Sequence, residues 1–325
     1  MEIKWKMRDY LESDRIRFID WRNIVDHRII KEDFFNWQYY LNPFGPVDTW
    51  VAVDGQKIVG QYSLQKYEYF YHGEKVIGSL CFDVATHPDY RYQGMFTKLG
   101  FHSLEKAGEK NISFSLGFPW VNGIAIPGHK KVGWTLLGKL KVYEKEVLEE
   151  YKSENINDYT IQVIDKFDTK FDLLALKHKQ DCSIMLNRTG AYLNWRYRQK
   201  IGYNFYCYEI LNEADQLVGF FILKLYEEQE HKTLHIIDFI LPSDENVYHK
   251  LLKFAFNFAL KNNAEKISLI VNEKLKFFNF LKKNNFKRQE NHFIPILHVN
   301  NDKVILDKMN NLEDYYFTMG ENDIF

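Results

Sequence analysis

The phrase FFNWQYYLNP at residues 34–43 returns as AYLNWRYRQK at residues 191–200. Both copies contain an Asn-Trp pair among aromatic residues, and a Tyr, Tyr39 or Tyr197, follows two positions after the Trp. A match of a few letters can arise by chance. The sequence that follows each copy therefore decides whether the phrase marks an internal repeat, and with it the fold.

The same series of elements is expected after both copies. Three β-rich runs come first, separated by turn signals such as His72-Gly73. An amphipathic helix, which in the first copy is expected to end at Gly108, then leads to a short apolar strand and a second helix. The third run ends CFDV in one copy and IIDF in the other, so Asp83 corresponds to Asp238. We interpret the chain as an internal duplication.

The two halves have lengths and a composition typical of globular domains. The chain has 325 residues, 46% of them hydrophobic and 27% charged, which is enough for two domains of about 150 residues. We place the first domain at residues 1–150 and the second at residues 151–325. The polar stretch VLEEYKSENINDYTIQ, residues 147–162, is the expected link, and the C-terminal YYFTMGENDIF is expected to close the second domain.

Charge and composition argue against several classes of function. The net charge is −1, so a nucleic-acid binder or a membrane-surface binder is not indicated. The N-terminus is charged and has no signal-peptide core, and no window approaches the roughly 20 apolar residues of a membrane span. Cys81, Cys182 and Cys207 are scattered without metal-ligand spacing. We therefore expect a cytoplasmic protein with free thiols and no metal.

The copies differ where the third strand leads into the helix. The first reads HPDYRYQGMFTKL at residues 87–99, and the second reads LPSDENVYHKLLKF at residues 241–254. The N-terminus of a helix presents unpaired N–H groups and a positive dipole end, which suit phosphate. Gly94 permits a close approach of the backbone, and Arg91 adds a positive charge. This spacing alone is a weak signal, because an Arg and a Gly often precede helices.

The stretch VATHPDYRYQGMFTKL, residues 84–99, resembles motif A of the GNAT (GCN5-related) acyltransferases, whose pyrophosphate loop reads R/Q-x-x-G-x-G/A. Arg91 and Gly94 match this loop. Phe96 departs from its final small residue, which implies looser or shifted packing there. The family's order of elements matches both halves. The resemblance therefore implies an α/β tandem GNAT fold with two mixed central sheets flanked by helices, and acyl-CoA as co-substrate.

By this resemblance, the acyl-CoA site lies in the first half. Backbone groups of Val84 and Thr86 would contact the pantetheine arm, and Asn122 lies near a position where the family often has an Asn that contacts CoA. The loop residues implied in pyrophosphate binding are Arg91, Tyr92, Gln93, Gly94, Met95 and Phe96. The second half lacks the loop, so we expect it to bind no CoA and to serve as an acceptor-side or scaffold domain.

Acyl transfer needs a free amine, a polarised thioester and a proton for the leaving thiolate. Asp83 lies in the apolar strand SLCFDVA, where GNAT enzymes often carry an acidic residue facing the amine. His129 occupies a slot in which many of them have a Tyr that acts as general acid. The alternative for Asp83 is a structural hydrogen-bonding role, since Asp238 stands at the same place in the other copy. The alternative for His129 is a surface residue on a polar turn.

The repeated Asn-Trp phrase has two interpretations. Trp37 and Tyr40 in the first copy, and Arg196 in the second, are candidates for stacking on an acceptor ring or binding its phosphate. The alternative is a packing anchor that both halves inherited. We favour packing for the phrase as a whole, because it is also present in the copy that lacks the CoA loop. Arg196 has no Arg counterpart in the first copy.

The phrases YLNWRY and YFT-G--D-F resemble GNAT-type proteins of bacterial surface-polysaccharide clusters, including O-antigen pathways. This implies transfer of an acetyl or 3-hydroxybutyryl group to a nucleotide-linked amino sugar, such as a dTDP-linked 3-amino-3,6-dideoxyhexose, by a monomer or homodimer. One alternative is a tandem-GNAT aminoacyl transferase that carries amino acids from tRNA to peptidoglycan precursors; the CoA loop and the neutral charge balance argue against it. The other is a non-catalytic CoA-binding module.

Overall fold

The computed structural model describes residues 4–27, 29–152, 158–290 and 293–322. Two expected segments fall partly outside these ranges: the polar link at 153–157, and the end of the closing segment at 323–325. The chain forms two compact units. Unit 1 comprises residues 1–139 and 292–311, and unit 2 comprises residues 140–291 and 312–325.

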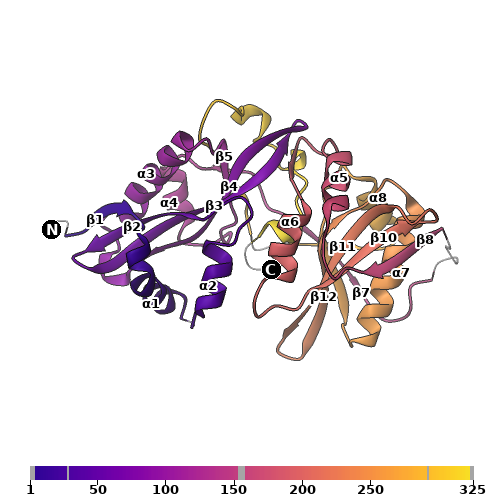
Figure 1. Ribbon diagram of the computed structural model, residues 1–325. Coiled ribbons are helices and arrows are strands. Elements are labelled where there is room, and N and C mark those ends of the chain that lie inside the picture. The colour runs from indigo at the N-terminus through magenta and orange to yellow at the C-terminus, as the bar shows by residue number, and fades with distance from the viewer. Residues whose placement is uncertain (1–3, 28, 153–157, 291–292, 323–325) are drawn as a thin grey trace. The chain divides into compact units, whose positions relative to one another are not determined.

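Unit 1 is built on a mixed sheet with the order β1-β2-β3-β4-β5-β15-β6 (Figure 1). Its strands are β1 (Lys6–Asp9), β2 (Asp48–Asp54), β3 (Lys57–Tyr71), β4 (Glu74–Thr86), β5 (Phe114–Gly117), β15 (Ile296–Val299) and β6 (Thr135–Leu136). Along this order, β4 and β5 are parallel and the other neighbours are antiparallel. Its helices are α1 (Arg15–Asp26), α2 (Glu32–Tyr39), α3 (Met95–Glu109) and α4 (Ile126–Lys131).

Unit 2 repeats this plan with the order β14-β7-β13-β12-β11-β10-β8. Its strands are β14 (Lys287–Glu290), β7 (Lys141–Glu146), β13 (Lys266–Ile270), β12 (His231–Ile240), β11 (Leu217–Glu228), β10 (Tyr206–Asn212) and β8 (Tyr159–Val163). The helices are α5 (Thr169–Lys177), α6 (Gly190–Leu193), which continues as a π-helix over Asn194–Arg198, α7 (Glu245–Lys261) and α8 (Lys276–Lys283). Its parallel pair is β12 and β13. The expected duplication is confirmed.

The units exchange one strand in each direction along the sequence. β7 follows the first copy but pairs with β13 and β14, whereas β15 follows the second copy but pairs with β5 and β6. The compact units therefore differ from the contiguous ranges 1–150 and 151–325. Each exchanged strand covers an otherwise unpaired edge of a short, buried strand, β5 or β13.

Local turn chemistry accounts for the connections. The hairpin between β3 and β4 turns at His72 and Gly73, whose φ values of 50° and 83° suit a tight two-residue turn. Gly108 does not cap α3, contrary to the expectation, because the helix runs to Glu109. Glycine is needed at Gly108 for a different reason: a Cβ there would lie 2.5 Å from the carbonyl oxygen of Asn300.

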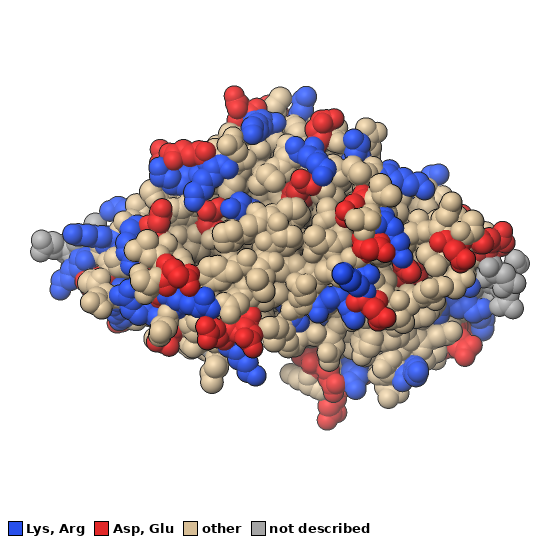
Figure 2. All heavy atoms as spheres, in the orientation of Figure 1, with Lys and Arg blue, Asp and Glu red and all other residues tan. Residues whose placement is uncertain are grey.

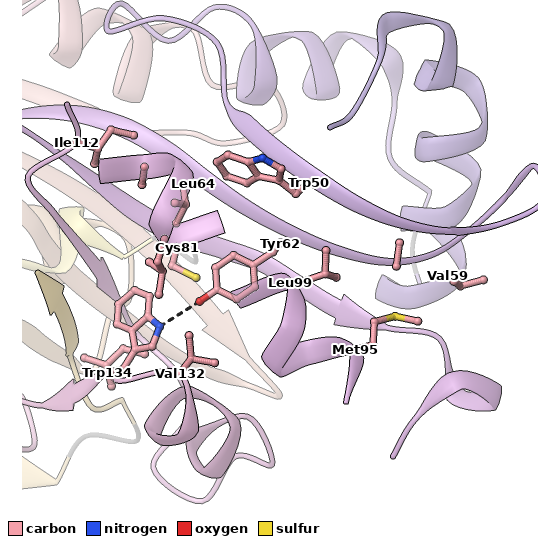
Figure 3. Packing of buried hydrophobic residues seen from close by; sticks show 14 of the residues in the cluster. Trp50, Val59, Tyr62, Leu64, Cys81, Met95, Leu99, Ile112, Val132 and Trp134 are labelled. Carbon is pink, nitrogen blue, oxygen red and sulfur yellow. Dashed lines mark hydrogen bonds between the residues drawn. The ribbon is translucent and has the colours of Figure 1, made fainter. Parts of the chain in front are cut away.

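The core of unit 1 lies between α3 and the sheet (Figure 3). Leu99, Ser103 and Ala107 recur at helical spacing and are buried, as the amphipathic pattern predicted. Burying a side chain such as Leu99 stabilises the fold by about 1.5–3 kcal/mol. Trp134 donates a hydrogen bond to the Tyr62 hydroxyl at 3.1 Å, which satisfies both polar groups within this core (Figure 3).

The helices lie on both faces of the unit 1 sheet (Figure 1). Successive residues of a strand face opposite sides. Gln61 accordingly accepts a hydrogen bond from Trp21 of α1, whereas the ring of Tyr62 packs beside Phe96 of α3 and His129 of α4. Basic and acidic side chains are interspersed on the face in Figure 2. No helix among the described residues is long and apolar enough to cross a bilayer.

Candidate functional site

The two parallel strands of unit 1 separate halfway along β4. Their pairing ends at Cys81 and Gly117, where β5 stops. β4 continues to Thr86, and over this stretch its strand pairing is with β3. In the described part of the chain, no strand pairs with this end of β4 on the side toward β5. The backbone groups of Val84 and Thr86, expected to contact pantetheine, belong to this opened edge.

The segment after β4 turns into α3 with two residues in the left-handed region. Tyr92 has a φ of 63° and Gly94, the N-cap of α3, has a φ of 73°. The N–H of Lys98 donates to the carbonyl of Gly94 at 3.0 Å and forms the first helical hydrogen bond. The N–H groups of residues 95–97 therefore have no acceptor within the helix, and they can bind an anion.

Neighbouring protein atoms leave the space around Gly94, at the N-terminus of α3, open. A Cβ at Gly94 would meet no atom within 4 Å, so only the backbone conformation requires glycine there. Arg91 and Tyr92 are exposed beside this position, and Gln93 is half-buried. The loop thus combines a free helix start, one guanidinium and unobstructed access, which fit a pyrophosphate group.

Phe96 stands where the resembling family has a small residue, and α4 compensates for its size. The ring of Phe96 meets the ring of His129 edge-on at a centroid distance of 5.0 Å. Gly128 lies against the same ring, because a Cβ there would be 2.7 Å from it. The large Phe96 ring is therefore accommodated beside Gly128, and the helical start of α3 is kept.

His129 is buried at 5% exposure among Phe96, Tyr62 and Trp134. Burial lowers the pKa of His129 to about 4, so its ring is neutral at pH 7. Its Nδ1 is buried and has no hydrogen-bond partner among the described residues. His129 is therefore not the surface residue of the alternative interpretation.

Asp83 lies at a bulge in β4, with a φ of 53°. Arg22 of α1 donates from Nη2 to Asp83 Oδ1 at 2.8 Å and from Nη1 to the Asp83 carbonyl oxygen at 3.3 Å. Tyr39 of α2 donates its hydroxyl hydrogen to Oδ2 at 2.7 Å. The side chain of Asp83 is 11% exposed and that of Arg22 is 3% exposed. Both the carboxylate and the unusual backbone conformation are thus fixed by neighbouring helices.

The charge of Arg22 is maintained by its surroundings. Burial lowers its pKa, but Asp83, Tyr39 and Asp26 outweigh burial and raise the pKa above its ordinary value. Asp26 accepts a third hydrogen bond from Arg22 at 2.5 Å. The guanidinium therefore stays charged and meets two carboxylates.

The aromatic residues of the first phrase are used in packing. Trp37 is 2% exposed and its ring lies 5.3 Å from that of Phe34. Tyr40 donates its hydroxyl to Glu12 at 2.5 Å and shares a further hydrogen bond with Tyr10. Burial and these partners raise the pKa of Tyr40. The arrangement favours the packing interpretation of the phrase over stacking on an acceptor.

Unit 2 contains a matching aspartate. Cys81 lies opposite Leu64 in β3, and Ile236 lies opposite Leu223 in β11. The bulges that follow differ, because Asp83 is skipped in the pairing whereas Asp238 is paired with Ile222. These registers put Asp238 at the place of Asp83. Tyr197 donates to Asp238 Oδ2 at 2.8 Å, and Arg188 donates from Nε to Oδ1 at 2.7 Å. The side chains of Arg188 and Asp238 are fully buried.

The opening between β12 and β13 is filled by the C-terminal segment, residues 315–322. Asn272, just beyond β13, donates to the Tyr315 carbonyl at 2.7 Å. Tyr316 donates to the carbonyl of Phe239, the counterpart of Val84, at 3.0 Å. Thr318 donates to Asp238 Oδ1 at 3.0 Å. In unit 2 the C-terminal segment therefore lies along β12. The corresponding place in unit 1 is the space along the free edge of β4.

Glycine is required within this segment. A Cβ at Gly320 would lie 3.0 Å from Asp238 and would collide with the hydroxyl of Tyr197. Arg196, proposed from the sequence for an acceptor phosphate, is 3% exposed and donates to the main-chain oxygen of Asn322 at 2.5 Å. Its guanidinium is directed at the C-terminal segment of its own unit, so the phosphate role has no support in this arrangement. Asn122 is exposed on the turn that precedes α4.

Sequence reasoning missed the partners of the two aspartates. The repeated Tyr39 and Tyr197 were visible as a signal, because both stand two residues after the Trp of the phrase. Arg22 and Arg188 gave no such signal, since Arg22 lies within α1 and Arg188 just before α6. Among the described residues, no group of three or more His, Cys, Asp and Glu side chains is arranged to hold a metal ion.

Comparisons with known proteins agree with this geometry. Residues 25–137 match the family model of the acetyltransferase (GNAT) domain, and no curated protein matches the sequence. A GCN5-related N-acetyltransferase from Anabaena variabilis has a TM-score of 0.71 and 16% identity, over 91% of this chain and 73% of that one. A tandem GNAT protein from the clavulanic acid biosynthesis pathway has a TM-score of 0.59 and 11% identity, over 92% of this chain and 100% of that one.

Saccharomyces cerevisiae N-myristoyltransferase with bound myristoyl-CoA is also similar in structure, with a TM-score of 0.59 and 10% identity, over 92% of this chain and 83% of that one. These likenesses confirm the α/β fold with two mixed sheets that is shared with tandem GNAT structures. The stretch that is similar to the acetyltransferase (GNAT) domain lies within the first half of the chain. The GNAT family uses acyl-CoA, and the comparisons do not identify the substrate that receives the acyl group.

Proposed function

We propose that this enzyme transfers an acyl group, acetyl or 3-hydroxybutyryl, from acyl-CoA to the amino group of a nucleotide-linked amino sugar. The acyl-CoA part rests on the contrast between the two halves. In unit 1 the free edge of β4 leads into the open start of α3, beside Arg91. In unit 2 the corresponding edge of β12 is covered by residues 315–322.

The residues that would hold acyl-CoA follow from this edge. The N–H groups from Tyr92 to Phe96 and the side chain of Arg91 would bind the pyrophosphate. The backbone groups of Val84 and Thr86 would hydrogen-bond the amides of the pantetheine arm, and Asn122 would contact the same arm. Support comes from the φ values of Tyr92 and Gly94, which turn successive N–H groups at the start of α3.

The reaction replaces one bond to the acyl carbon with another. The free amine attacks the thioester carbonyl, a C–N bond forms, the C–S bond breaks, and the proton lost from nitrogen ends on the thiol of CoA. Alignment of the two substrates supplies much of the rate. His129 is proposed to donate a hydrogen bond to the leaving sulfur, and the proton itself reaches the sulfur through solvent. This role is supported by its neutral ring and by Nδ1, which has no partner among the described residues.

The acceptor part rests on the resemblance of YLNWRY and the C-terminal YFT-G--D-F to proteins of surface-polysaccharide clusters. A direct test incubates the purified chain with acetyl-CoA or 3-hydroxybutyryl-CoA and measures the release of CoA thiol. A dTDP-linked 3-amino-3,6-dideoxyhexose is expected to be acylated at its amino group, with mass spectrometry showing an amide. Preferred acylation of a peptide amine, or transfer from aminoacyl-tRNA without acyl-CoA, would contradict the proposal.

A further inference from the structure

The filled cleft of unit 2 shows what the aspartate at this place in the fold can bind. Asp238 accepts a hydrogen bond from Tyr197 at Oδ2 and one from Arg188 at Oδ1. Its Oδ1 also accepts the N–H of Phe239 at 2.9 Å and the hydroxyl of Thr318 at 3.0 Å. Thr318 belongs to the segment that fills the cleft. A hydroxyl group of the segment that fills the cleft therefore reaches this carboxylate, to which Tyr197 and Arg188 also donate.

Unit 1 has the same carboxylate with fewer partners. Asp83 is held by Tyr39 at Oδ2 and by Arg22 at Oδ1. No described residue takes the position that Thr318 has in unit 2. A carboxylate offers about four acceptor positions, and 11% of the Asp83 side chain is exposed. Asp83 can thus accept a further hydrogen bond from a group that enters along β4.

Asp83 is a poor choice as the base for the amine. A proton placed on Asp83 would remove one of the two carboxylates that compensate the buried charge of Arg22, and breaking such a pair is costly. The bulge would also weaken, because Arg22 holds the carboxylate and the carbonyl of the same residue. These contacts suit a carboxylate that binds and orients a neighbouring group.

We propose that Asp83 is a recognition residue for the acceptor, accepting a hydrogen bond from a sugar hydroxyl at the place that Thr318 takes on Asp238, and that Tyr39 is the positioning residue that orients it. The proposal rests on the proposed N-acyl transfer and specifies the class of acceptor, a hydroxylated amine. A site built to accept a hydroxyl discriminates against analogues that lack it, because the polar group of the protein is then left unpaired.

The test compares three amines with acetyl-CoA: a dTDP-linked 3-amino-3,6-dideoxyhexose, glucosamine, and butylamine, which has no hydroxyl. Release of CoA thiol gives kcat and KM for wild type and Asp83→Asn between pH 6 and 9. Asn still accepts a hydrogen bond but carries no charge and cannot act as a base. We expect the KM of the hydroxylated amines to rise about 10-fold, since hydrogen bonds to charged groups are roughly twice as strong. The kcat should fall far less than on the loss of a base, the pH profile should keep its shape, and the KM of butylamine should change far less than that of the hydroxylated amines.

A base role gives the opposite pattern, because kcat would fall about 10²–10⁴-fold for all three amines, butylamine included. That result would overturn the proposal, as would a wild type that prefers butylamine to both sugars. Acylation of glucosamine but not of the nucleotide sugar would contradict the proposed function alone, and the Asp83 comparison would then be made with glucosamine. A wild type that acylates none of the three amines would overturn both.

Tyr39→Phe provides a second variant if Asp83→Asn does not fold. It removes the hydroxyl that orients Oδ2 and keeps the ring, so the KM of the hydroxylated amines should rise several-fold at unchanged kcat. Tyr197→Phe is the matched control, because it removes the same hydrogen bond from Asp238 in unit 2. It should leave all acceptor KM values unchanged. An equal effect of the two Tyr variants on KM would show a general loss of structure and would overturn the assignment.

Discussion

Tyr39 donates its hydroxyl hydrogen to Asp83 at 2.7 Å and so ties α2 to the bulge of β4, 44 positions further along the chain. Tyr197 makes the same hydrogen bond to Asp238 at 2.8 Å. The repeated phrase of the sequence is explained by this pair. Its Tyr holds the strand aspartate, and its Trp, Trp37 or Trp195, is buried beside it.

The first prediction concerns stability. Tyr197→Phe should lower the free energy of unfolding by about 1–3 kcal/mol, because a fully buried carboxylate loses a donor. Urea denaturation monitored by circular dichroism measures this change. Tyr206→Phe is the control, since Tyr206 lies 36% exposed in β10, in the sheet that contains Asp238, and its hydroxyl has no hydrogen-bond partner among the described residues. It should change the free energy by less than about 0.5 kcal/mol. Equal losses would refute a specific role for the Tyr197 hydroxyl.

The sequence predicted the fold where local pattern determines structure. The turn at His72-Gly73, the helices of residues 95–109 and 245–261, and the match of Asp83 with Asp238 follow from turn chemistry and periodicity. The exchange of β7 and β15 did not follow. These strands have six and four residues, and nothing within such short segments specifies which sheet they join.

The candidate site was predictable to a similar extent. The loop of Arg91 and Gly94 was visible as a motif because its function depends on adjacent residues. The pairing of Phe96 with Gly128, and of Arg22 with Asp83, joins distant segments whose members each look ordinary alone. Such contacts arise from packing, and a single sequence does not display them.

The second prediction tests the loop. Arg91→Glu should weaken the binding of acetyl-CoA at least about 10-fold, because it places a negative charge beside the site assigned to the pyrophosphate. Isothermal titration calorimetry measures the affinity, and the melting temperature without ligand should be unchanged since Arg91 is exposed. Asn246→Glu adds a charge at the start of α7, the counterpart of α3, and should leave the affinity unaltered. Native affinity in Arg91→Glu would exclude the loop as the anion site.

The third prediction concerns the segment that fills unit 2. Thr318→Val keeps the shape of the side chain and removes the hydroxyl, whose single hydrogen lies within reach of both Asp238 and Glu321. The free energy of unfolding should fall by about 1–3 kcal/mol, since buried acceptors lose a partner. The affinity for acetyl-CoA should stay at the wild-type value, because the proposed CoA site lies in unit 1. A large loss of CoA affinity in a folded Thr318→Val protein would argue against that division of roles.

The last prediction concerns pH. The pKa of His129 is lowered to about 4 in the folded protein by burial, whereas an unfolded chain has an ordinary His pKa of about 6.5. Between these values the unfolded state binds more protons than the folded state, so stability rises with pH. The contribution of His129 is complete above pH 6.5 and is lost as pH falls to 4, with a total on the order of 3 kcal/mol.

His129→Phe should flatten this part of the pH dependence of the unfolding free energy, whatever its effect at pH 7. His72→Asn, which changes an exposed His in a turn, should leave the slope as in wild type. A slope that persists in His129→Phe would assign the pH dependence to other groups, of which His235, with a pKa also lowered to about 4 by burial, would be tested next.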